Sequence, residues 1–228
     1  MKIIGLLGGT SWVSTVEYYR QINKKVNERL GKNHSAKIIL SSMDYEEIKQ
    51  YNYQNWEKIE DILTDEIMKL DSCKVDCMLI CNNTLHKALD DIKPYLYAEA
   101  PIFHIVDCVG EYAKKNNFKN ILLFGTKFTM EDGFYHKKLK EYGLNIITPA
   151  EDERMEIQRI TQEELAKEKF TDVSRKWFQE IVAKYPCDAV VVGCTELPMI
   201  IKQEDYNIPI LNTLDLHCEK AVNFSLEN

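Results

Sequence analysis

The stretch DAVVVGCTELPM, residues 188–199, decides the fold, because the chain carries a second copy of its pattern. The segment DCMLICNNTLHK, residues 76–87, has the same leading aspartate, apolar run and polar turn, 112 positions earlier (188 − 76). Two further pairs follow in the same order: PIFHIVD (101–107) with PILNTLD (209–215), and IIGLLGGT (3–10) with NILLFGT (120–126). Ordered matches at near-constant spacing indicate a duplication into two α/β halves.

Apolar, β-rich runs predict eight strands, at 2–9, 36–42, 76–81, 100–107, 119–126, 144–149, 188–194 and 207–213. Polar stretches between several of them predict helices at 14–30 and 56–71, and two helices within 151–184 that are broken near Phe170. Short strands that are apolar throughout and alternate with helices indicate parallel sheets covered on both faces. We therefore expect an α/β fold: two pseudo-symmetric three-layer αβα lobes with mainly parallel sheets and a ligand cleft between them.

The length of 228 residues suits two such lobes better than one compact core. We predict an N-terminal lobe from residues 1–98 and 210–228, and a C-terminal lobe from residues 99–209. A composition that is 45% hydrophobic and 29% charged is typical of an ordinary soluble globular protein. The N-terminal MKIIGLLGG is interpreted as a strand and not as a signal peptide.

Charge and cysteine content exclude several functional classes. A net charge of −7 argues against a nucleic-acid partner, which needs a basic surface. No apolar run reaches the length of a membrane-spanning helix, so no membrane association is expected. The 7 cysteines show no disulfide-framework spacing, which favours reduced thiols and a cytoplasmic location.

The duplication aligns Cys194 with Asn82 and Gly193 with Cys81. A shift of one position at a strand end turns a side chain to the other face of the sheet. We therefore expect Asn82 to point into the cleft opposite Cys194, and Cys81 to point into its own lobe. A Cys81 that reaches the cleft stays open as an alternative.

Cys194 stands where a strand gives way to a loop, and ligands of open α/β sheets bind beyond such strand ends. We expect it to open a helix whose free N–H groups lower the pKa of the thiol. A thiolate in this place can attack an electrophile or remove a proton from carbon. The alternative is a buried structural cysteine.

Hydroxyl, amide and carboxyl groups crowd the same strand ends and suit a small carboxylate or amino acid as ligand. The candidate substrate-binding residues are Thr10, Ser11, Asn83, Thr84, Thr126, Thr129, Thr195 and Glu196. Thr10 and Ser11 could instead cap the helix that follows them.

Two histidines are candidates for a supporting role. His86 could orient the first loop, or could be an ordinary helix-face histidine. His217 could lie near Cys194, where an imidazole would help to hold a thiolate, or could lie on the surface. The other histidines and the cysteines at 73, 77 and 81 give no metal-ligand spacing that converges, so we predict no metal site.

Four of these motifs together resemble the aspartate/glutamate racemase family, which works without a cofactor. They are GLLGGTSW (5–12), NNTLH (82–86), GTKFTM (125–130) and GCTEL (193–197), and the similarity covers nearly the whole chain. The first motif, together with SSMDYEEI (41–48), is most similar to a bacterial branch associated with L-aspartate and L-glutamate. The resemblance implies an isomerase with no cofactor, a small dicarboxylic amino acid as substrate, and a homodimer.

The family pattern implies a two-base mechanism, in which one cysteine takes the α-proton and the other returns a proton to the opposite face. By that resemblance Cys194 acts on the L-enantiomer. Asn82 departs from the pattern, because it occupies the place of the first catalytic cysteine and a carboxamide is neither a base nor an acid near pH 7. We therefore expect a racemase that prefers the L-form. A one-cysteine isomerase or decarboxylase of the same superfamily and a non-catalytic amino-acid-binding protein remain alternatives.

Overall fold

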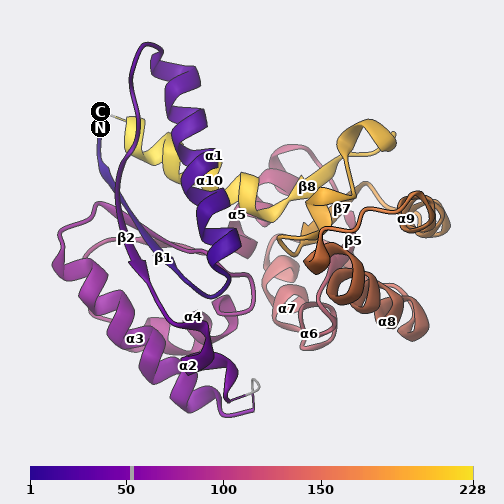
Figure 1. The fold of residues 1–228 in the computed structure, drawn as a ribbon, viewed down its shortest axis with the longest axis horizontal. Helices are drawn as coiled ribbons and strands as arrows, with labels where there is room; N and C mark the ends of the chain where they lie inside the picture. Colours follow the sequence, from indigo (N-terminus) through magenta and orange to yellow (C-terminus); the bar gives the residue numbers. More distant parts are fainter. Residues whose placement is uncertain (52–53, 228) are drawn as a thin grey trace. The chain divides into compact units, whose positions relative to one another are not determined.

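The computed structural model describes residues 1–51 and 54–227. Contacts between residues divide the chain into two compact units (Figure 1). Unit 1 comprises Met1–Ile105 and His217–Asn228, and unit 2 comprises Val106–Leu216. The chain passes from one unit to the other inside two helices, α5 (Ile105–Lys115) and α10 (Thr213–Leu226).

Strands of the described residues form one four-stranded parallel sheet in each unit. The sheet of unit 1 has the order β2 (Lys37–Ser42), β1 (Ile3–Gly8), β3 (Cys77–Ile80) and β4 (Ile102–Phe103). The sheet of unit 2 has the order β6 (Asn145–Ile147), β5 (Asn120–Gly125), β7 (Ala189–Gly193) and β8 (Ile210–Asn212). Each predicted strand is present, and the two sheets repeat one topology, as the duplication predicts.

Two groups of helices cover the two faces of the sheet in unit 1. Its helices are α1 (Trp12–Leu30), α2 (Tyr45–Lys49), α3 (Trp56–Ser72), α4 (His86–Ile92), the 3₁₀ turn η1 (Lys93–Tyr95) and the part of α10 from His217 onward. A Cβ on Gly5 would meet Leu70 of α3, whereas a Cβ on Gly8 would meet Thr15 of α1. Alternate residues of β1 thus face α3 and α1, which lie on opposite sides of the sheet.

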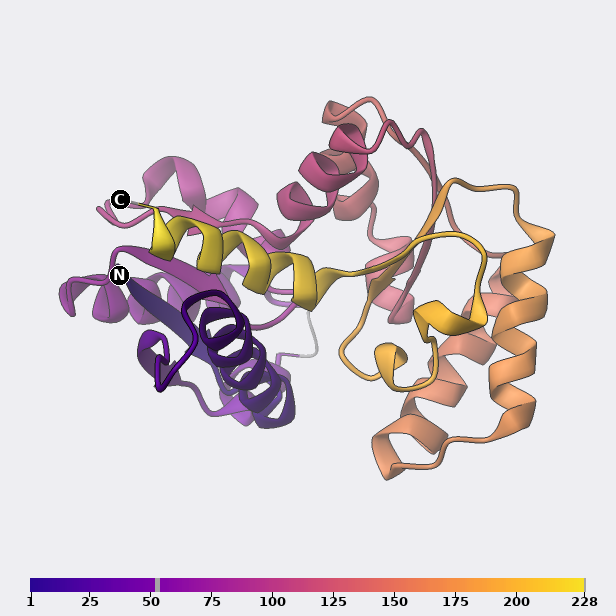
Figure 2. The same ribbon diagram turned by 90° about the horizontal axis from the view of Figure 1, so that it is seen from above.

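The apolar core of unit 1 fills the space between the sheet and the helices α3 and α4. Its residues include Leu7, Ile59, Leu63, Ile67, Met78, Ile80, Leu85 and Leu89. On the other face α1 and α10 run side by side (Figure 1 and Figure 2), joined by an ion pair of Arg29 with Glu219. Burial of apolar side chains on both faces is what makes a parallel sheet stable.

Unit 2 repeats this arrangement with shorter helices. They are α5, α6 (Lys127–Glu131), α7 (Phe134–Glu141), α8 (Glu151–Arg159) and α9 (Asp172–Lys184), with the 3₁₀ turns η4 (Leu197–Met199) and η5 (Gln203–Asp205) before β8. The predicted break within residues 151–184 is confirmed. α8 runs into a π turn, η2 (Ile160–Glu164), and a 3₁₀ turn, η3 (Leu165–Lys167), before α9 begins.

One aspartate in each unit binds the start of a neighbouring strand. The carboxylate of Asp76 accepts the N–H of Ile3 at 2.5 Å, and that of Asp188 accepts the N–H of Asn120 at 2.7 Å. These are the leading aspartates of the two repeated segments. The duplication thus preserves a hydrogen bond that aligns the amino ends of the central strands.

The strand predicted at 100–107 is shorter than expected. β4 covers only Ile102–Phe103, because α5 already begins at Ile105. Along the described residues, no helix combines the length and the apolar character needed to cross a membrane.

Gly9 allows the turn between β1 and α1, and its substitution tests that role. Gly9 has a φ of +93°, and a Cβ there would lie 2.0 Å from the carbonyl oxygen of Met43. Gly133 has the same φ but open space around it, which makes it a matched control. We expect Gly133→Ala to lower the free energy of unfolding by about 1 kcal/mol and Gly9→Ala by about 3 kcal/mol or more, measured by urea denaturation. Equal losses would contradict the steric account.

Candidate functional site

The loop after β1 carries the first group of predicted binding residues. The N–H of Gly9 donates to Oγ1 of Thr15 at 2.9 Å, which ties the loop to α1. Ser11 accepts the N–H of Ser14 at 3.4 Å, so it caps α1, as one of the two predicted roles requires. The hydroxyl of Thr10 is buried and has no hydrogen-bond partner among the described residues. A buried hydroxyl left without a partner is the group in this loop that is available for a ligand.

The carboxamide of Asn82 joins the loops after β1 and β3. Its Nδ2 donates to the carbonyl of Thr10 at 3.0 Å, and its Oδ1 accepts the N–H of Leu85 at 3.0 Å. Asn82 therefore bridges two loops of unit 1 through main-chain groups. The next two residues start α4, since the carbonyls of Asn83 and Thr84 accept the N–H groups of His86 and Lys87.

Three buried histidines of unit 1 lie behind Asn82. Nδ1 of His86 donates to the carbonyl of Asn82 at 2.7 Å, and Nε2 of His104 donates to the carbonyl of His86 at 3.2 Å. The ring of His86 lies edge-on to those of His104 and His217, with centroids 4.7 and 5.4 Å away. Nε2 of His86 is buried without a hydrogen-bond partner in the described part of the chain.

His217 uses both ring nitrogens within unit 1. Nε2 donates to the carbonyl of Phe103 at 2.8 Å, so Nδ1 accepts the hydroxyl of Tyr18 at 2.9 Å. Burial lowers the pKa of His217 to about 3, and burial with its two histidine neighbours lowers the pKa of His86 far below the usual range. Both rings are neutral near pH 7. The supporting role of His217 beside Cys194 stays a prediction, whereas its alternative, a histidine on the surface, is wrong, because the ring is fully buried.

Cys81 and Cys77 are enclosed within unit 1. Cys81 is 1% exposed, and its N–H donates to the carbonyl of Leu7. Burial raises the pKa of Cys81 and also that of Cys77, the latter to about 12. This burial is consistent with a Cys81 that points into its own lobe, which stays a prediction. Across the described residues, no group of three or more potential ligands is placed to hold a metal ion.

In unit 2 two threonines that follow β5, Thr126 and Thr129, form hydrogen bonds with each other. Thr126 caps α6, because its Oγ1 accepts the N–H of Thr129 at 3.2 Å. The two hydroxyl oxygens lie 3.0 Å apart and share a hydrogen bond. Thr129 is fully buried, and a Cβ on Gly125 would lie 2.9 Å from its methyl group. These threonines thus shape the strand end.

Cys194 follows β7 directly and lies beside two polar neighbours. Its Sγ donates to Oε2 of Glu196 at 2.8 Å, and Oγ1 of Thr195 donates to the same oxygen at 2.9 Å. The residues after Cys194 bend into the 3₁₀ turn η4. The predicted helix at this point is therefore a single short turn. Cys194 and Glu196 form a thiol–carboxylate pair.

The electrostatics of Cys194 differ from the prediction. Cys194 is 8% exposed, and burial raises the pKa of its thiol. The Glu196 carboxylate raises that pKa further, and the N–H groups of Glu196 and Leu197 lower it by less. The expected lowering by a helix N-terminus is wrong, because only two N–H groups are present and a carboxylate stands against them. At rest Cys194 is a neutral thiol.

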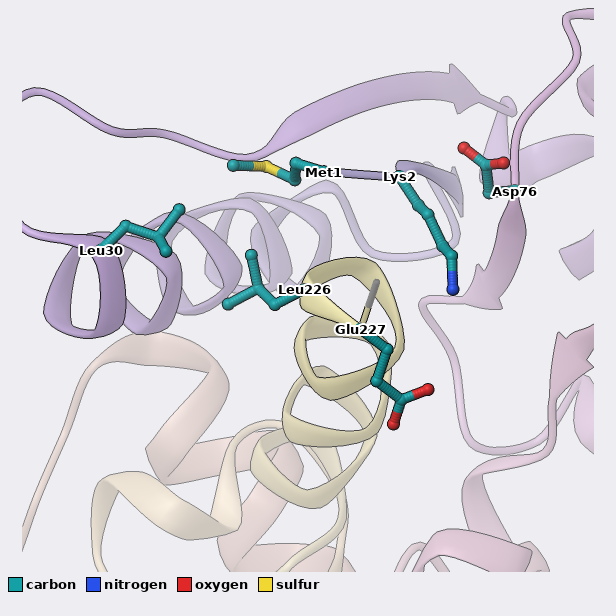
Figure 3. Close-up of a pocket in the computed structure, with 6 residues that line it drawn as sticks. All are labelled: Met1, Lys2, Leu30, Asp76, Leu226 and Glu227. Carbon is teal, nitrogen blue, oxygen red and sulfur yellow. The ribbon is translucent and has the colours of Figure 1, made fainter.

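A separate pocket of about 550 Å³ lies at the opposite, amino edge of the sheet in unit 1 (Figure 3). Met1, Leu30 and Leu226 line one side, and Lys2, Asp76 and Glu227 lie on the other. The carboxylate of Asp76 already accepts a backbone N–H, as described above. Ligands of parallel α/β sheets bind at the carboxyl ends of the strands, so the candidate site is at the other edge.

Comparisons with known proteins decide the family. The family model described as Asp/Glu/Hydantoin racemase matches residues 7–221.

The chain belongs to the Asp/Glu/Hydantoin racemase family.

The relatives of this racemase family member agree with the assignment. It is 35% identical to a protein from Yersinia pestis proposed to be an Asp/Glu racemase, over the whole of both chains, with a TM-score of 0.93. It is 32% identical to an aspartate racemase homologue from Pyrococcus horikoshii, again over both whole chains, with a TM-score of 0.91. The predicted family is therefore confirmed, and as a family of racemases it belongs to the isomerases.

A glutamate racemase from Aquifex pyrophilus is 27% identical over 163 residues. The match covers 68% of this chain but 58% of the Aquifex protein, so it spans less than two thirds of that relative.

Sequence reasoning missed three residues that hydrogen-bond to His217, His86 and Thr213. They are Tyr18 and His104 of unit 1 and Tyr135 of unit 2, all buried. A signal for the tyrosines was present, since 135 − 18 equals 125 − 8, the offset of 117 between Gly125 and Gly8. The duplication thus places one buried tyrosine after each central strand.

The neutral histidines predict how stability depends on pH. The pKa values of His86 and His217 are lower in the folded protein than the value of about 6.5 in an unfolded chain. As the pH falls below that value, the unfolded chain binds protons that the folded protein does not, so stability falls. We expect the free energy of unfolding to drop by about 2 kcal/mol between pH 7 and pH 5.5.

Urea denaturation at each pH measures this change. His34→Gln serves as control, because it removes an exposed histidine and leaves the three buried ones in place. A free energy of unfolding that is constant from pH 7 to pH 5.5 would show that the buried histidines take up protons in the folded state.

Proposed function

We propose that the protein is a cofactor-independent amino-acid racemase that acts on aspartate or glutamate, with Cys194 as the base for the L-enantiomer. The observation that carries the proposal is the hydrogen bond from the Cys194 thiol to the carboxylate of Glu196. A buried thiol needs a partner that removes its proton before it can act as a base. Glu196 is that partner, and its position two residues further on fixes it beside the sulfur.

The proton balance of the reaction follows from this pair. The thiol proton of Cys194 moves to Oε2 of Glu196, which gives a thiolate and a carboxylic acid. The thiolate then takes the α-proton of the L-amino acid, and a carbanion remains on the substrate. After both transfers the thiol is neutral again and the negative charge has passed from Glu196 to the substrate, so no net charge is added to the buried site. Glu196, predicted as a substrate-binding residue, thus has a catalytic role in the proposal.

The carbanion needs hydrogen-bond donors at the α-carboxylate of the substrate. The predicted binding residues of both units supply candidates, and the hydroxyl of Thr10 is the best supported, because it is buried and has no protein partner in the described chain. Ser11 and Thr126 contribute by capping α1 and α6, and Thr129 contributes by its hydrogen bond with Thr126. Asn83, Thr84 and Thr195 flank the two positions that the duplication aligns.

We propose an L-preference because no second thiol stands at the first-base position. Asn82 is bound to main-chain groups of Thr10 and Leu85, and Cys81 is buried. Water is then the proton donor for the opposite face of the carbanion. Exchange of the α-hydrogen on the L-face should therefore be faster than inversion.

The free thiols of the chain suit a reducing compartment, which favours the cytoplasm.

Hydrogen exchange in D₂O tests this proposal. We expect the protein to exchange the α-hydrogen of L-aspartate or L-glutamate, followed by proton NMR, and to form the D-enantiomer more slowly. Cys194→Ala should abolish exchange, and Glu196→Gln should slow it by about 100-fold or more, since general-base catalysis contributes about that much. Lys202→Gln, which changes an exposed residue of the same unit, serves as control.

The result distinguishes the alternatives. Release of carbon dioxide from a substituted malonate, or isomerisation of maleate, without exchange on any amino acid would favour a one-cysteine decarboxylase or isomerase. That reaction gains support from the enclosed position of Cys81 and the bonded state of Asn82. Thermal stabilisation by an amino acid without any exchange would indicate a binding protein.

We also propose that the protein forms a homodimer through an apolar patch on α1. Trp12, Val13, Val16 and Tyr19 form this patch, and Trp12 is 71% exposed. Patches of this kind on a soluble protein mark interaction sites. We expect Val16→Glu to produce a monomer in sedimentation experiments, whereas Val173→Glu, at an exposed position of α9, leaves a dimer. A monomeric wild type would contradict the proposal.

A further inference from the structure

Tyr135 of α7 lies directly behind the strand that carries Cys194. Its side chain is fully buried, and its hydroxyl is hydrogen-bonded to the side chain of Thr213. A Cβ on Gly193 would lie 3.5 Å from this hydroxyl oxygen, and Cys194 is close enough to affect its pKa electrostatically. The hydroxyl therefore adjoins the last residue of β7, immediately before the catalytic thiol of the proposed reaction.

The direction of the hydrogen bonds is fixed by Thr213. Its Oγ1 donates to the carbonyl oxygen of Val192 at 3.2 Å, and a carbonyl can only accept. The single hydroxyl proton of Thr213 is thus committed to Val192, so the Tyr135 hydroxyl donates to Thr213. The chain of bonds runs from Tyr135 through Thr213 to Val192, two residues before Cys194.

The proton of Tyr135 stays in place at every pH at which the reaction could run. Burial is the main cause that raises the pKa of Tyr135 far above the usual range of a phenol. The hydroxyl is therefore always a donor, and the chain of bonds does not change with pH. A fixed donor of this kind can orient a strand end, but it cannot itself exchange protons with a substrate.

We propose that Tyr135 is a positioning residue for Cys194 and acts through Thr213. The two hydroxyl groups hold the Val192–Gly193 segment at the end of β7, and this sets the direction in which the Cys194 thiol projects and its distance from Glu196. The inference rests on the proposed racemase function for the role of Cys194.

The counterpart in unit 1 shows what is particular to Tyr135. Tyr18 stands at the equivalent position, and its hydroxyl donates to His217, which in turn donates to the carbonyl of Phe103 in β4. Both tyrosines thus tie a helix to a strand end. Of these two series of hydrogen bonds, only the one that starts at Tyr135 ends on β7, the strand that directly precedes Cys194.

The change Tyr135→Phe removes the hydroxyl and keeps the ring. We expect kcat for α-hydrogen exchange on the L-enantiomer to fall about tenfold, with KM within about threefold of wild type, as for the loss of one buried hydrogen bond that orients a catalytic group. Tyr142→Phe is the matched control. Tyr142 follows on the same side of α7, and its hydroxyl donates to Asp107 at 3.0 Å. Its removal should leave kcat unchanged.

A double-mutant cycle separates positioning from general loss of stability. Thr213→Val should lower kcat as Tyr135→Phe does, and the double variant should lose no more than either single variant, because both act in one chain of bonds. Thr213→Ser keeps the hydroxyl and should restore the wild-type kcat. Additive losses, or a loss of the same size in Tyr142→Phe, would overturn the inference.

A readout that does not need turnover keeps the inference independent of the proposed function. The rate at which iodoacetamide alkylates Cys194, followed by peptide mass spectrometry, should change by about threefold or more in Tyr135→Phe and stay constant in Tyr142→Phe, because the reactivity of a thiol follows its surroundings. If the wild type exchanges no amino acid, the racemase proposal fails and this rate alone decides. Equal alkylation in all three proteins would refute the positioning role.

Discussion

Parallel pairing of the two central strands in each sheet is the constraint on which the candidate site depends. β1 pairs with β3 so that Leu7 stands opposite Ile80, and β5 pairs with β7 so that Gly125 stands opposite Gly193. The paired strands therefore end at the same level. Central strands of such sheets are buried on both faces, so polar chemistry is confined to the residues that follow them. The leading aspartates of the two repeats fix this register from the other end of the strands.

The two units share the same sheet topology but differ in the residues that follow their strands. In unit 2 the thiol of Cys194 directly follows β7. In unit 1 Cys81 directly follows β3, and the carboxamide of Asn82 comes one residue later. Cys194 is buried and Asn82 is partly buried, and a polar group withdrawn from water needs a partner. The carboxamide of Asn82 forms hydrogen bonds with main-chain groups of Thr10 and Leu85 and so links two loops. The thiol of Cys194 has a carboxylate as partner, which is the basis of the proposed proton transfer.

The fold and the family could be predicted from the sequence, whereas the state of the site could not. Apolar runs indicate strands directly, and the ordered repeats indicate two similar sheets, so these predictions rested on patterns that are visible in the sequence. The pKa of Cys194 depends on how deeply the thiol is buried and on which way the side chain of Glu196 turns, and neither is a local property of the sequence. The sequence does not distinguish Tyr135 from an ordinary core residue, and its hydrogen bond to Thr213, on which its proposed role rests, is visible only in the structure. β4 was predicted too long because apolar residues continue into α5 without a break.

An L-preference in a racemase needs a physical interpretation, since the two enantiomers have the same free energy in water. At equilibrium the enzyme must produce each from the other equally well, so kcat/KM for inversion is the same in both directions whatever the site contains. A thiol on one face alone can therefore create asymmetry only before inversion. In the proposed reaction Cys194 removes the α-proton, its thiol exchanges that proton with solvent, and it returns a solvent proton to the same face, many times for each carbanion that water captures on the other face. In the proposed reaction the difference between Cys194 and Asn82 would therefore be seen as exchange of the α-hydrogen that is faster than inversion.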